Sequence, residues 1–491
     1  MLFNHINRAA PWLSWPFMAA TSTLSIYLIL SFLNNWSRRV QSATTVLAGA
    51  EPLVATIVPT AGEPIEMLRR TMISVLDQDW PDERLCLLIG DDSHRDEVSA
   101  LVHALQQEYP AVRILYYRPP PRGSSYRRGD AKAGNLNAGL DTLRFNEIDA
   151  AFIETRDADD LVGDTSFLRR CLGPMMEDSQ IAYAQTIKES LVTPGDPFGN
   201  NDPLFYRGGI LSRQAANAVF PCGSGLVWRH AALQSIGDFP SWNLVEDLQS
   251  GMDALRRGWH GAYVPIVGAV GQTAPEDIPN LYKQRGTWAI DTVRLVLFRS
   301  MRGLNIRQKL HFLEMGLHYI SSPANLLCFL LPAISLIAGV PLLTGSNDAY
   351  VEHFWATLIA MELYLVALNG RAGWKNAFRS REIWIGLAPV YAAAIFKAIV
   401  NGRNKKPTYR VTRKSHLHAW YWRQTLPQAA TLILLVAAMA KAVATGSFLQ
   451  WQYLGFAYWW ILGTVLMGSF LRKSWFGLHP GPKSAFARFS S

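Results

Sequence analysis

Four long apolar segments constrain this chain more than any other feature of its sequence. They run from Trp12 to Leu33, Ile320 to Leu343, Leu426 to Thr445 and Phe448 to Leu471. Each is long enough to cross a hydrocarbon core about 30 Å thick, which takes about 20 helical residues. A fifth, shorter segment from Val351 to Leu368 contains Glu362, whose charge is costly in lipid and is expected to face protein or water. The sequence therefore predicts a membrane protein.

Charges beside the apolar segments predict their orientation. The stretch from Ile383 to Val400 has basic residues on both sides and Lys397 inside it, so we expect it to lie in the interface. Five spans from an outside N-terminus leave the turn near Gly446 outside and the basic tail inside. The first apolar segment is longer than a signal-peptide core and is read as a retained helix. We expect a multi-pass protein of the cell (inner) membrane.

The composition excludes several classes of protein. Of 491 residues, 49% are apolar and 17% are charged, with a net charge of +9, which does not fit a disordered, collagen-like or disulfide-rich secreted chain. The basic residues cluster beside apolar segments, where they indicate a lipid bilayer rather than nucleic acid as partner. The four cysteines are scattered without a CxxC pair, which favours neither a zinc site nor a disulfide framework.

The chain divides into four parts. Residues 1–50 are expected to form the first membrane helix and a linker, 51–302 a cytoplasmic domain, 303–471 the transmembrane and interfacial region, and 472–491 a cytoplasmic tail. The cytoplasmic part begins with a strand pattern at Leu53 to Val58, a helix at Pro64 to Leu76 and a strand at Leu85 to Ile89. Further strands are predicted at Val112 to Tyr117 and Ala150 to Thr155. This order predicts a parallel sheet with helical crossovers and ligands beyond its carboxyl edge.

Two acidic clusters follow predicted strands. Asp91 and Asp92 come after the second strand, and Asp157, Asp159 and Asp160 come after the strand ending at Thr155. Two carboxylates separated by one residue can hold a divalent cation through oxygen ligands and leave other positions to a diphosphate. By itself such a pair is weak evidence, because it also arises by chance in solvated loops.

Other motifs stand in a fixed order around these clusters. They are Lys-Ala-Gly-Asn-Leu-Asn at 132–137, Gln185 and Thr186, the stretch Phe220 to Gly225, Glu246 and Asp247, the stretch Gln284 to Trp288, and Tyr-x-Val-Thr-x-Lys at 409–414. Six motifs in one order are hard to attribute to chance.

In this order the motifs resemble the family 2 inverting glycosyltransferases, specifically the cellulose-synthase-like membrane enzymes that include hyaluronan and chitin synthases. The resemblance runs from about Leu53 to Leu471. It implies an α/β catalytic domain of the GT-A type on a helical transmembrane channel of about five spans and interfacial helices. Such an enzyme polymerises a UDP-sugar into a β-linked polysaccharide and passes the polymer across the membrane.

The resemblance also implies roles for individual residues. Asp247, beside Glu246, corresponds to the catalytic base, and Asp157 and Asp159 correspond to ligands of Mg2+ or Mn2+. Acceptor binding falls to Cys222, Gly223, Ser224 and Trp288. Nucleotide-sugar binding falls to Thr60, Glu63, Asp91, Asp92, Lys132, Asp157, Gln284, Arg285, Tyr409, Thr412 and Lys414. The last three belong to a gating loop at 403–416.

The chain departs from the family pattern at four positions. Thr287 stands where an arginine is usual, Asp130 where histidine is frequent, Arg156 where an apolar residue is usual, and Val245 where the family has threonine. The loss of an arginine at Thr287 removes a fixed positive fork near the diphosphate, and Arg285 is the nearest substitute.

The leading hypothesis is processive synthesis of a β-glucan from UDP-glucose, with the growing polysaccharide as acceptor and accessory export proteins as further partners. A synthase using UDP-N-acetylglucosamine or another UDP-sugar remains an alternative, as does a non-processive enzyme with a lipid acceptor. An inactive transporter or scaffold is the third class, against which the intact Asp157, Asp159 and Asp247 argue. Fold likeness by itself selects neither the sugar nor the linkage.

Overall fold

The computed structural model describes residues 6–41, 43–244, 246–344, 355–370, 373–407, 419–447 and 451–476. Its centre is an eight-stranded sheet in the order β3-β2-β1-β4-β7-β6-β8-β5. The strands are β1 (Val54–Thr60), β2 (Leu85–Asp91), β3 (Arg113–Tyr117), β4 (Phe152–Thr155), β5 (Asp160–Val162), β6 (Ile181–Ser190), β7 (Leu226–Arg229) and β8 (His260–Gly271).

The first four strands confirm the sequence pattern. β1, β2, β3 and β4 pair in parallel, and the predicted helix at Pro64 to Leu76 is α2 (Ile65–Leu76). Beyond these strands the sheet is mixed, because β7 pairs antiparallel with β4 and β6, and β5 pairs antiparallel with β8. β5 and β7 contain 3 and 4 residues, which is too short for a periodic pattern to show in the sequence.

Both faces of the sheet are buried. In β1, Val54 and Val58 join one apolar cluster while Ala55 and Ile57 join the other, as the alternation of side chains along a strand requires. One face is covered by α2, α3 (Asp96–Glu108) and α5 (Phe167–Glu177). The opposite face is covered by α4 (Ala131–Phe145), α6 (Ile210–Ala215) and α7 (His230–Ile236). This double cover explains why the first strands read as continuous apolar runs.

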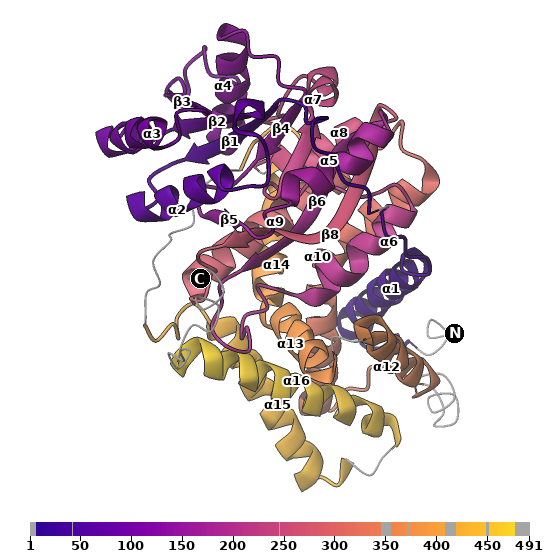
Figure 1. Ribbon diagram of the computed structural model, residues 1–491. Coiled ribbons are helices and arrows are strands. Elements are labelled where there is room, and N and C mark those ends of the chain that lie inside the picture. The colour runs from indigo at the N-terminus through magenta and orange to yellow at the C-terminus, as the bar shows by residue number, and fades with distance from the viewer. Residues whose placement is uncertain are drawn as a thin grey trace.

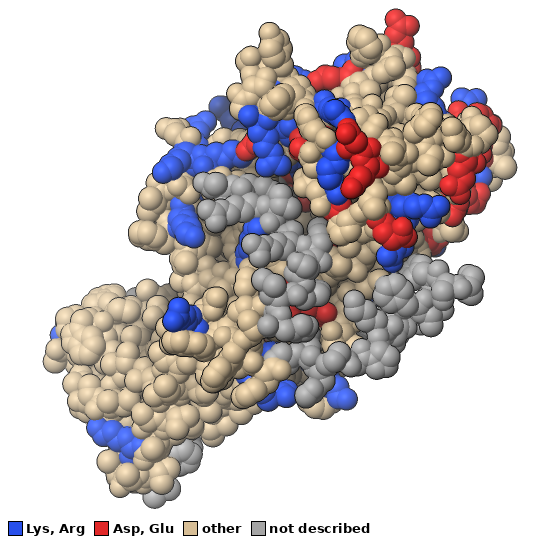
Figure 2. Space-filling model, turned by 90° about the vertical axis from the view of Figure 1, so that its left-hand side faces the viewer, with Lys and Arg blue, Asp and Glu red and all other residues tan. Residues whose placement is uncertain are grey.

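A second body of helices lies on one side of the sheet domain (Figure 1). It comprises α1 (Pro11–Asn34), α10 (Ile306–Ala338), α12 (Ala356–Asn369), α13 (Gly373–Gly386), α14 (Ala388–Asn401), α15 (Leu426–Ala444) and α16 (Trp451–Phe476). In the view of Figure 2 the charged side chains gather over the sheet domain, and the part of the helical body that faces the viewer carries few of them. The two bodies therefore face different surroundings.

The apolar segments predicted from the sequence are helical over most of their described length, although α10 ends at Ala338, five residues before the predicted end at Leu343. By length and composition, α1, α10 and α15 can cross a membrane, and the pair α13 and α14, bent by 50°, counts as a fourth span if its halves are joined. The predicted segment Ile383 to Val400 straddles this bend. The predicted span ending at Leu471 falls in α16, which is not among the helices that are both long and apolar enough to cross a membrane. The fifth predicted segment contains only the shorter apolar helix Leu358–Leu368. The number of spans and the interfacial position of Ile383 to Val400 stay predictions.

Glu362 contacts protein, as expected for an acid in an apolar segment. Arg381 donates hydrogen bonds to both of its carboxylate oxygens, at 2.8 and 2.7 Å. The Tyr458 hydroxyl donates a third at 2.5 Å. α12, α13 and α16 are thereby tied together by a charged pair inside the helical body.

The two bodies are joined by α9 (Ile278–Phe298), which leaves the sheet domain and packs against the bent pair. Ile278, Leu281 and Ala289 of α9 are buried with Tyr391 and Ala394 of α14. Because α9 also carries the Gln284 to Trp288 motif, this packing brings the motif next to the apolar helices.

Candidate active site

The carboxyl ends of the parallel strands carry the first polar residues of the site. At the end of β1, the Thr60 hydroxyl donates to Glu63 Oε2 at 2.7 Å. Arg95 joins this turn to the neighbouring one by donating to the Glu63 carbonyl at 2.7 Å. The parallel register of β1 and β2 places Thr60 beside Asp91, so these two strand ends lie next to each other.

Asp91 and Asp92, both predicted to bind nucleotide, make different contacts. The buried Asp91 carboxylate accepts from the backbone N–H groups of Ser93 and Arg95 at 2.9 and 2.8 Å, so it closes its own turn. Asp92 accepts two hydrogen bonds from the guanidinium of Arg127, at 2.6 and 2.9 Å. This two-pronged pair fixes the loop that leads into α4, a contact that the sequence motifs did not suggest.

Lys132 joins its own motif to three others. It lies in the first turn of α4, where Asp130 caps the helix by accepting from the Ala131 N–H at 2.8 Å. Its ammonium group donates to Asp157 Oδ1 at 2.6 Å and to the Gly223 carbonyl at 2.7 Å. Glu246 Oε1 lies 3.6 Å from the same nitrogen. The Lys-Ala-Gly-Asn motif, the acidic cluster, the Phe220 to Gly225 loop and the start of α8 (Glu246–Arg256) thus meet at one point.

The Phe220 to Gly225 loop is held in place from β6. Gln185 accepts from the Cys222 N–H at 2.6 Å and donates to the Ser224 carbonyl at 3.1 Å. The hydroxyl of Ser224 is fully buried and accepts from the Asp157 N–H at 3.1 Å, so this residue fixes the acidic loop.

Gly223 has a backbone φ of +81°, and a β-carbon there would meet Asp247 Oδ2 at 3.0 Å and Lys132 Nζ at 3.2 Å. Glycine is thus required here both by the backbone and by the closeness of Asp247.

Two aspartates of the site, the predicted base Asp247 and the predicted metal ligand Asp157, have opposite pKa shifts. Burial, and after it the negative charge of Glu246, raise the pKa of Asp247 to about 8 from an ordinary value of 3.8, although Lys132 opposes the rise. Burial would also raise the pKa of Asp157, but the ammonium groups of Lys132 and Lys188 outweigh it and hold that pKa well below its usual range. The geometry therefore separates a carboxylate that holds a proton near neutral pH from one that stays ionised.

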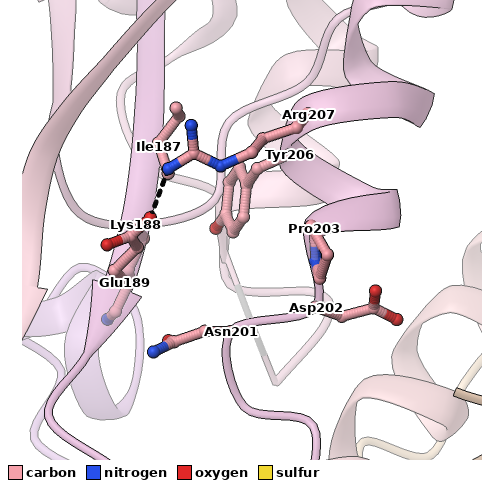
Figure 3. A pocket seen from close by; sticks show the side chains of 8 residues that line it. All are labelled: Ile187, Lys188, Glu189, Asn201, Asp202, Pro203, Tyr206 and Arg207. Atoms are coloured by element: carbon pink, nitrogen blue, oxygen red, sulfur yellow. Dashed lines mark hydrogen bonds and ion pairs between the residues drawn. The ribbon is translucent and has the colours of Figure 1, made fainter. Parts of the chain in front are cut away.

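Lys188 is a residue of the site that the sequence motifs missed. From the end of β6 its ammonium group lies 2.8 Å from Asp157 Oδ2 and 2.7 Å from Asp160 Oδ2. It lines a small surface pocket together with Glu189, Tyr206 and Arg207 (Figure 3). The only sequence signal is the position of this lysine, two residues beyond the Gln185 and Thr186 motif.

The acidic loop after β4 suits a hard divalent cation in its chemistry. Its carboxylate oxygens are the ligands that Mg2+ and Mn2+ prefer, and each Asp157 oxygen keeps a lone pair beside its lysine. Asp159 is buried, and its backbone carbonyl accepts from the Gln272 N–H at 2.7 Å. The Asp160 carboxylate oxygen Oδ1 is buried and accepts no hydrogen bond from the described residues.

Within the described part of the chain no three His, Cys, Asp or Glu side chains are grouped to hold a metal. A cation here would therefore take further ligands from a diphosphate or from water.

The acceptor motif lies on α9. Trp288 is 38% exposed, and the Arg285 guanidinium lies over its ring at 4.8 Å from the centroid. Arg285 also donates to the Gly199 carbonyl at 3.0 Å, while the Thr287 hydroxyl is bonded within the helix to the Lys283 carbonyl at 2.8 Å. Gln284 lies one residue before Arg285 and is partly buried. The charge of Arg285 is thus directed to Trp288, which leaves its expected role at a diphosphate as a prediction.

Two further positions complete the placement of the predicted residues. Arg156 is fully buried in an ion pair with Glu154 at 2.6 Å, so this departure from the family pattern is a paired charge beneath the acidic loop. Val245 and the gating-loop residues Tyr409, Thr412 and Lys414 lie outside the described residues.

Comparison with known families gives the same assignment as the geometry. Residues 51–290 match the family described as "Glycosyltransferase like family 2". The chain contains a family 2 glycosyltransferase domain. The match includes every described site residue named above, from Thr60 to Trp288.

The glycosyltransferase domain also has relatives among curated bacterial proteins. The chain is 29% identical over 351 residues to the cellulose synthase 1 catalytic subunit (UDP-forming) of Komagataeibacter xylinus, which covers 67% of this chain and 43% of that protein. It is 28% identical over 364 residues to the cellulose synthase catalytic subunit (UDP-forming) of Pseudomonas fluorescens (strain SBW25), with 70% and 46% covered. The chain thus spans less than half the length of these relatives.

A solved structure shows the same fold. A mannosyltransferase from Pyrobaculum calidifontis, in complex with GDP-Man and Mn2+, superposes with a TM-score of 0.57 at 17% identity, over 79% of this chain and 99% of that one. The fold is the expected GT-A glycosyltransferase fold with additional apolar helices.

Proposed function

We propose that this glycosyltransferase transfers glucose from UDP-glucose to the end of a growing β-glucan, with inversion at the anomeric carbon. The names of the bacterial relatives support a UDP-forming glucan synthase, although the chain covers only part of their length. The neighbouring apolar helices support a membrane location. The basic residues beside the apolar segments favour a sheet domain on the cytoplasmic side of the inner membrane.

The observation that carries the proposal is the pKa of Asp247, raised to about 8 by burial and by Glu246, at a point that Lys132 links to Asp157. A general base works best when its pKa lies near the operating pH. The pKa of Asp247 meets this condition. Because Gly223 has no side chain, the space directly beside the Asp247 carboxylate stays open.

Each residue of the site then has a role in one displacement. Asp247 accepts the proton of the acceptor hydroxyl while the oxygen of that hydroxyl forms a bond to the anomeric carbon. The bond from the anomeric carbon to the diphosphate oxygen breaks, and its electron pair leaves with UDP. Lys132 offsets part of the negative charge that the diphosphate gains. When bound at Asp157 and Asp159, Mg2+ or Mn2+ supplies further charge neutralisation to this leaving group.

We place the acceptor on the apolar ring of Trp288. This residue lies on α9, the helix that joins the sheet domain to the membrane helices. Sugar rings pack well on an aromatic face, and Trp288 is 38% exposed with Arg285 over one face of its ring, which leaves the opposite face for a sugar. Because α9 packs on the bent pair α13 and α14, a polymer end resting on Trp288 is next to the apolar helices. This arrangement favours a processive enzyme that moves its product across the membrane.

A single-transfer enzyme is the second candidate, and one observation favours it. The structural neighbour is named a mannosyltransferase and was solved with GDP-Man, and this chain matches 99% of its length. A nonpolymeric acceptor such as a lipid would then replace the growing polysaccharide. UDP-N-acetylglucosamine is the further alternative donor.

Product analysis separates these candidates. Membranes containing the chain would be incubated in parallel with UDP-glucose, UDP-N-acetylglucosamine and GDP-mannose, and the products digested with linkage-specific hydrolases. We expect UDP-glucose to give a polymer that a β-glucanase degrades. Incorporation of one sugar into organic-extractable lipid, without polymer, would contradict the proposal. The same membranes with Asp247→Asn give the background.

The proposed orientation has its own test. Thr445, in the exposed turn after α15, is expected outside, and Ser37, after α1, is expected inside. In a background without native cysteines, Thr445→Cys should react with an impermeant thiol reagent in intact cells and Ser37→Cys should not. The reverse labelling would invert the topology.

A further inference from the structure

Lys188 occupies the centre of the acidic cluster in which the cation of a glycosyltransferase is expected. Its ammonium group lies 2.8 Å from Asp157 Oδ2 and 2.7 Å from Asp160 Oδ2. The negative charge of Asp159 also attracts it. The negative charges of all three aspartates of the loop therefore attract this one lysine, which extends toward them from β6.

The second lysine completes the neutralisation. Lys132 takes the other oxygen of Asp157 at 2.6 Å, so that each oxygen of this carboxylate faces an ammonium group. The charge of Glu246 is 3.6 Å from Lys132, and no contact in the described structure brings it to Lys188. Asp157 is thus shared between two fixed positive charges before any ligand arrives.

A divalent cation that ligates Asp157 must lie close to both ammonium groups. Like charges at such distances repel strongly, and the repulsion is larger in a partly dry site than in water. A nucleoside diphosphate changes this balance, because its phosphate oxygens give the cation further ligands and give the lysines a new partner. The orphaned Asp160 oxygen Oδ1 leaves the cluster with unused capacity for a cation.

We propose that Lys188 is a tethered counter-ion, anchored on Asp160, that competes with the divalent cation for Asp157, so that the cation binds only together with the nucleoside diphosphate. Metal-free protein keeps its acidic loop closed on Lys188. Arrival of the diphosphate draws the lysine toward the phosphates and releases carboxylate oxygens to the cation. The proposal deepens the proposed function, on which it rests for the identity of the diphosphate.

The chain offers a matched control for Lys188. Arg207 lines the same small pocket and is also positively charged, but its ion pair, at 2.6 Å, is with Glu189 (Figure 3). Arg207→Gln therefore removes one positive charge from the same neighbourhood without releasing the acidic cluster. Lys188→Arg keeps a cation at the position itself.

The test is Mn2+ binding to purified full-length protein in nanodiscs, measured by electron paramagnetic resonance with and without UDP. For the wild type we expect Mn2+ to bind at least tenfold more tightly when UDP is present. Lys188→Gln should bind Mn2+ without UDP at least tenfold more tightly than the wild type. Arg207→Gln and Lys188→Arg should behave like the wild type.

Two results would overturn the proposal. One is an unchanged Mn2+ affinity of Lys188→Gln in the absence of UDP, and the other is a wild type that binds no Mn2+ even with UDP, which would mean that Lys188 replaces the cation altogether. Lys188→Met, which keeps the aliphatic length, repeats the measurement if the Gln variant does not fold. The nucleotide-free arm involves no donor or transfer, so its outcome is independent of whether the proposed glucan synthesis is correct.

Discussion

The acidic loop after β4 and the first turn of α8 each contribute an aspartate to one site, and the two carboxylates behave in opposite ways. Lys132 and Lys188 each take one oxygen of Asp157, whereas Asp247 has Glu246 as its sequence neighbour and shares Lys132 with two other acids. The pKa of Asp157 is lowered and that of Asp247 is raised to about 8. The number of cations within reach, rather than the residue type, decides which acid stays ionised and which holds a proton.

The largest expected effect is on the ionised side of this comparison. Asp157→Asn combined with Asp159→Asn removes the charge that would hold a cation under the diphosphate, so polymer formation should be abolished. Incorporation of radiolabelled sugar measures it, and membrane insertion of the variant is the control. Full activity of the double variant would break the assignment of this loop to the leaving group.

The next effect is on the protonated side. Asp247→Asn keeps the shape of the side chain but removes the proton acceptor, so turnover should fall by about a hundredfold or more with UDP affinity nearly unchanged. Wild-type turnover should rise with pH up to about 8, because only the ionised form can accept a proton, and the variant should lose this rise. Loss of UDP binding with turnover retained would make Asp247 a structural residue.

The same pKa predicts how stability depends on pH. Because the folded state raises the pKa of Asp247 from 3.8 to about 8, it holds the proton more tightly than the unfolded chain does. Between these two pKa values the unfolded chain loses this proton while the folded protein keeps it, so the free energy of unfolding falls as the pH rises. The melting temperature of Asp247→Asn should exceed that of the wild type most clearly above pH 8, and an equal difference at pH 4 would contradict this origin.

A smaller effect is expected from a substitution of Gly223, the glycine that lies beside Asp247 and Lys132. Gly223→Ala places a β-carbon 3.0 Å from Asp247 Oδ2 at a φ of +81°. We expect a loss of about 1 kcal/mol or more in folding stability, measured by denaturant unfolding, together with reduced turnover. Gly237→Ala, which also has positive φ but meets nothing within 4 Å, separates backbone strain from the displacement of Asp247.

The smallest effects are expected on α9. Trp288→Ala removes a stacking face worth on the order of 1 kcal/mol, so elongation should suffer more than UDP binding. Thr287→Arg adds the missing guanidinium and should raise donor affinity if Arg285 stays on the Trp288 ring, which calorimetry with UDP can measure. Equal polymer length and rate in Trp288→Ala would remove this ring from acceptor binding.

Much of the fold was predictable because its signals are local. The strands at Leu53 to Val58 and Leu85 to Ile89 are buried on both faces and read as continuous apolar runs. β5, β7 and the antiparallel pairing were not predictable, because strands of 3 and 4 residues carry no periodicity. The motifs at Lys132, Asp157, Gly223 and Glu246 predicted a shared site because their residue types suit one reaction, and the structure brings them into contact.

The division into a sheet domain and apolar helices can be predicted from the amino-acid sequence, since hydrophobic length and alternation need no tertiary context. The sequence also contains the acids that are available for catalysis. That Lys188 joins Asp157, that Arg127 fixes Asp92 and that Arg285 stacks on Trp288 is known only from the folded chain. Charges separated by tens of residues interact strongly only where folding brings them close together and removes much of the water between them, and no spacing along the chain records that distance.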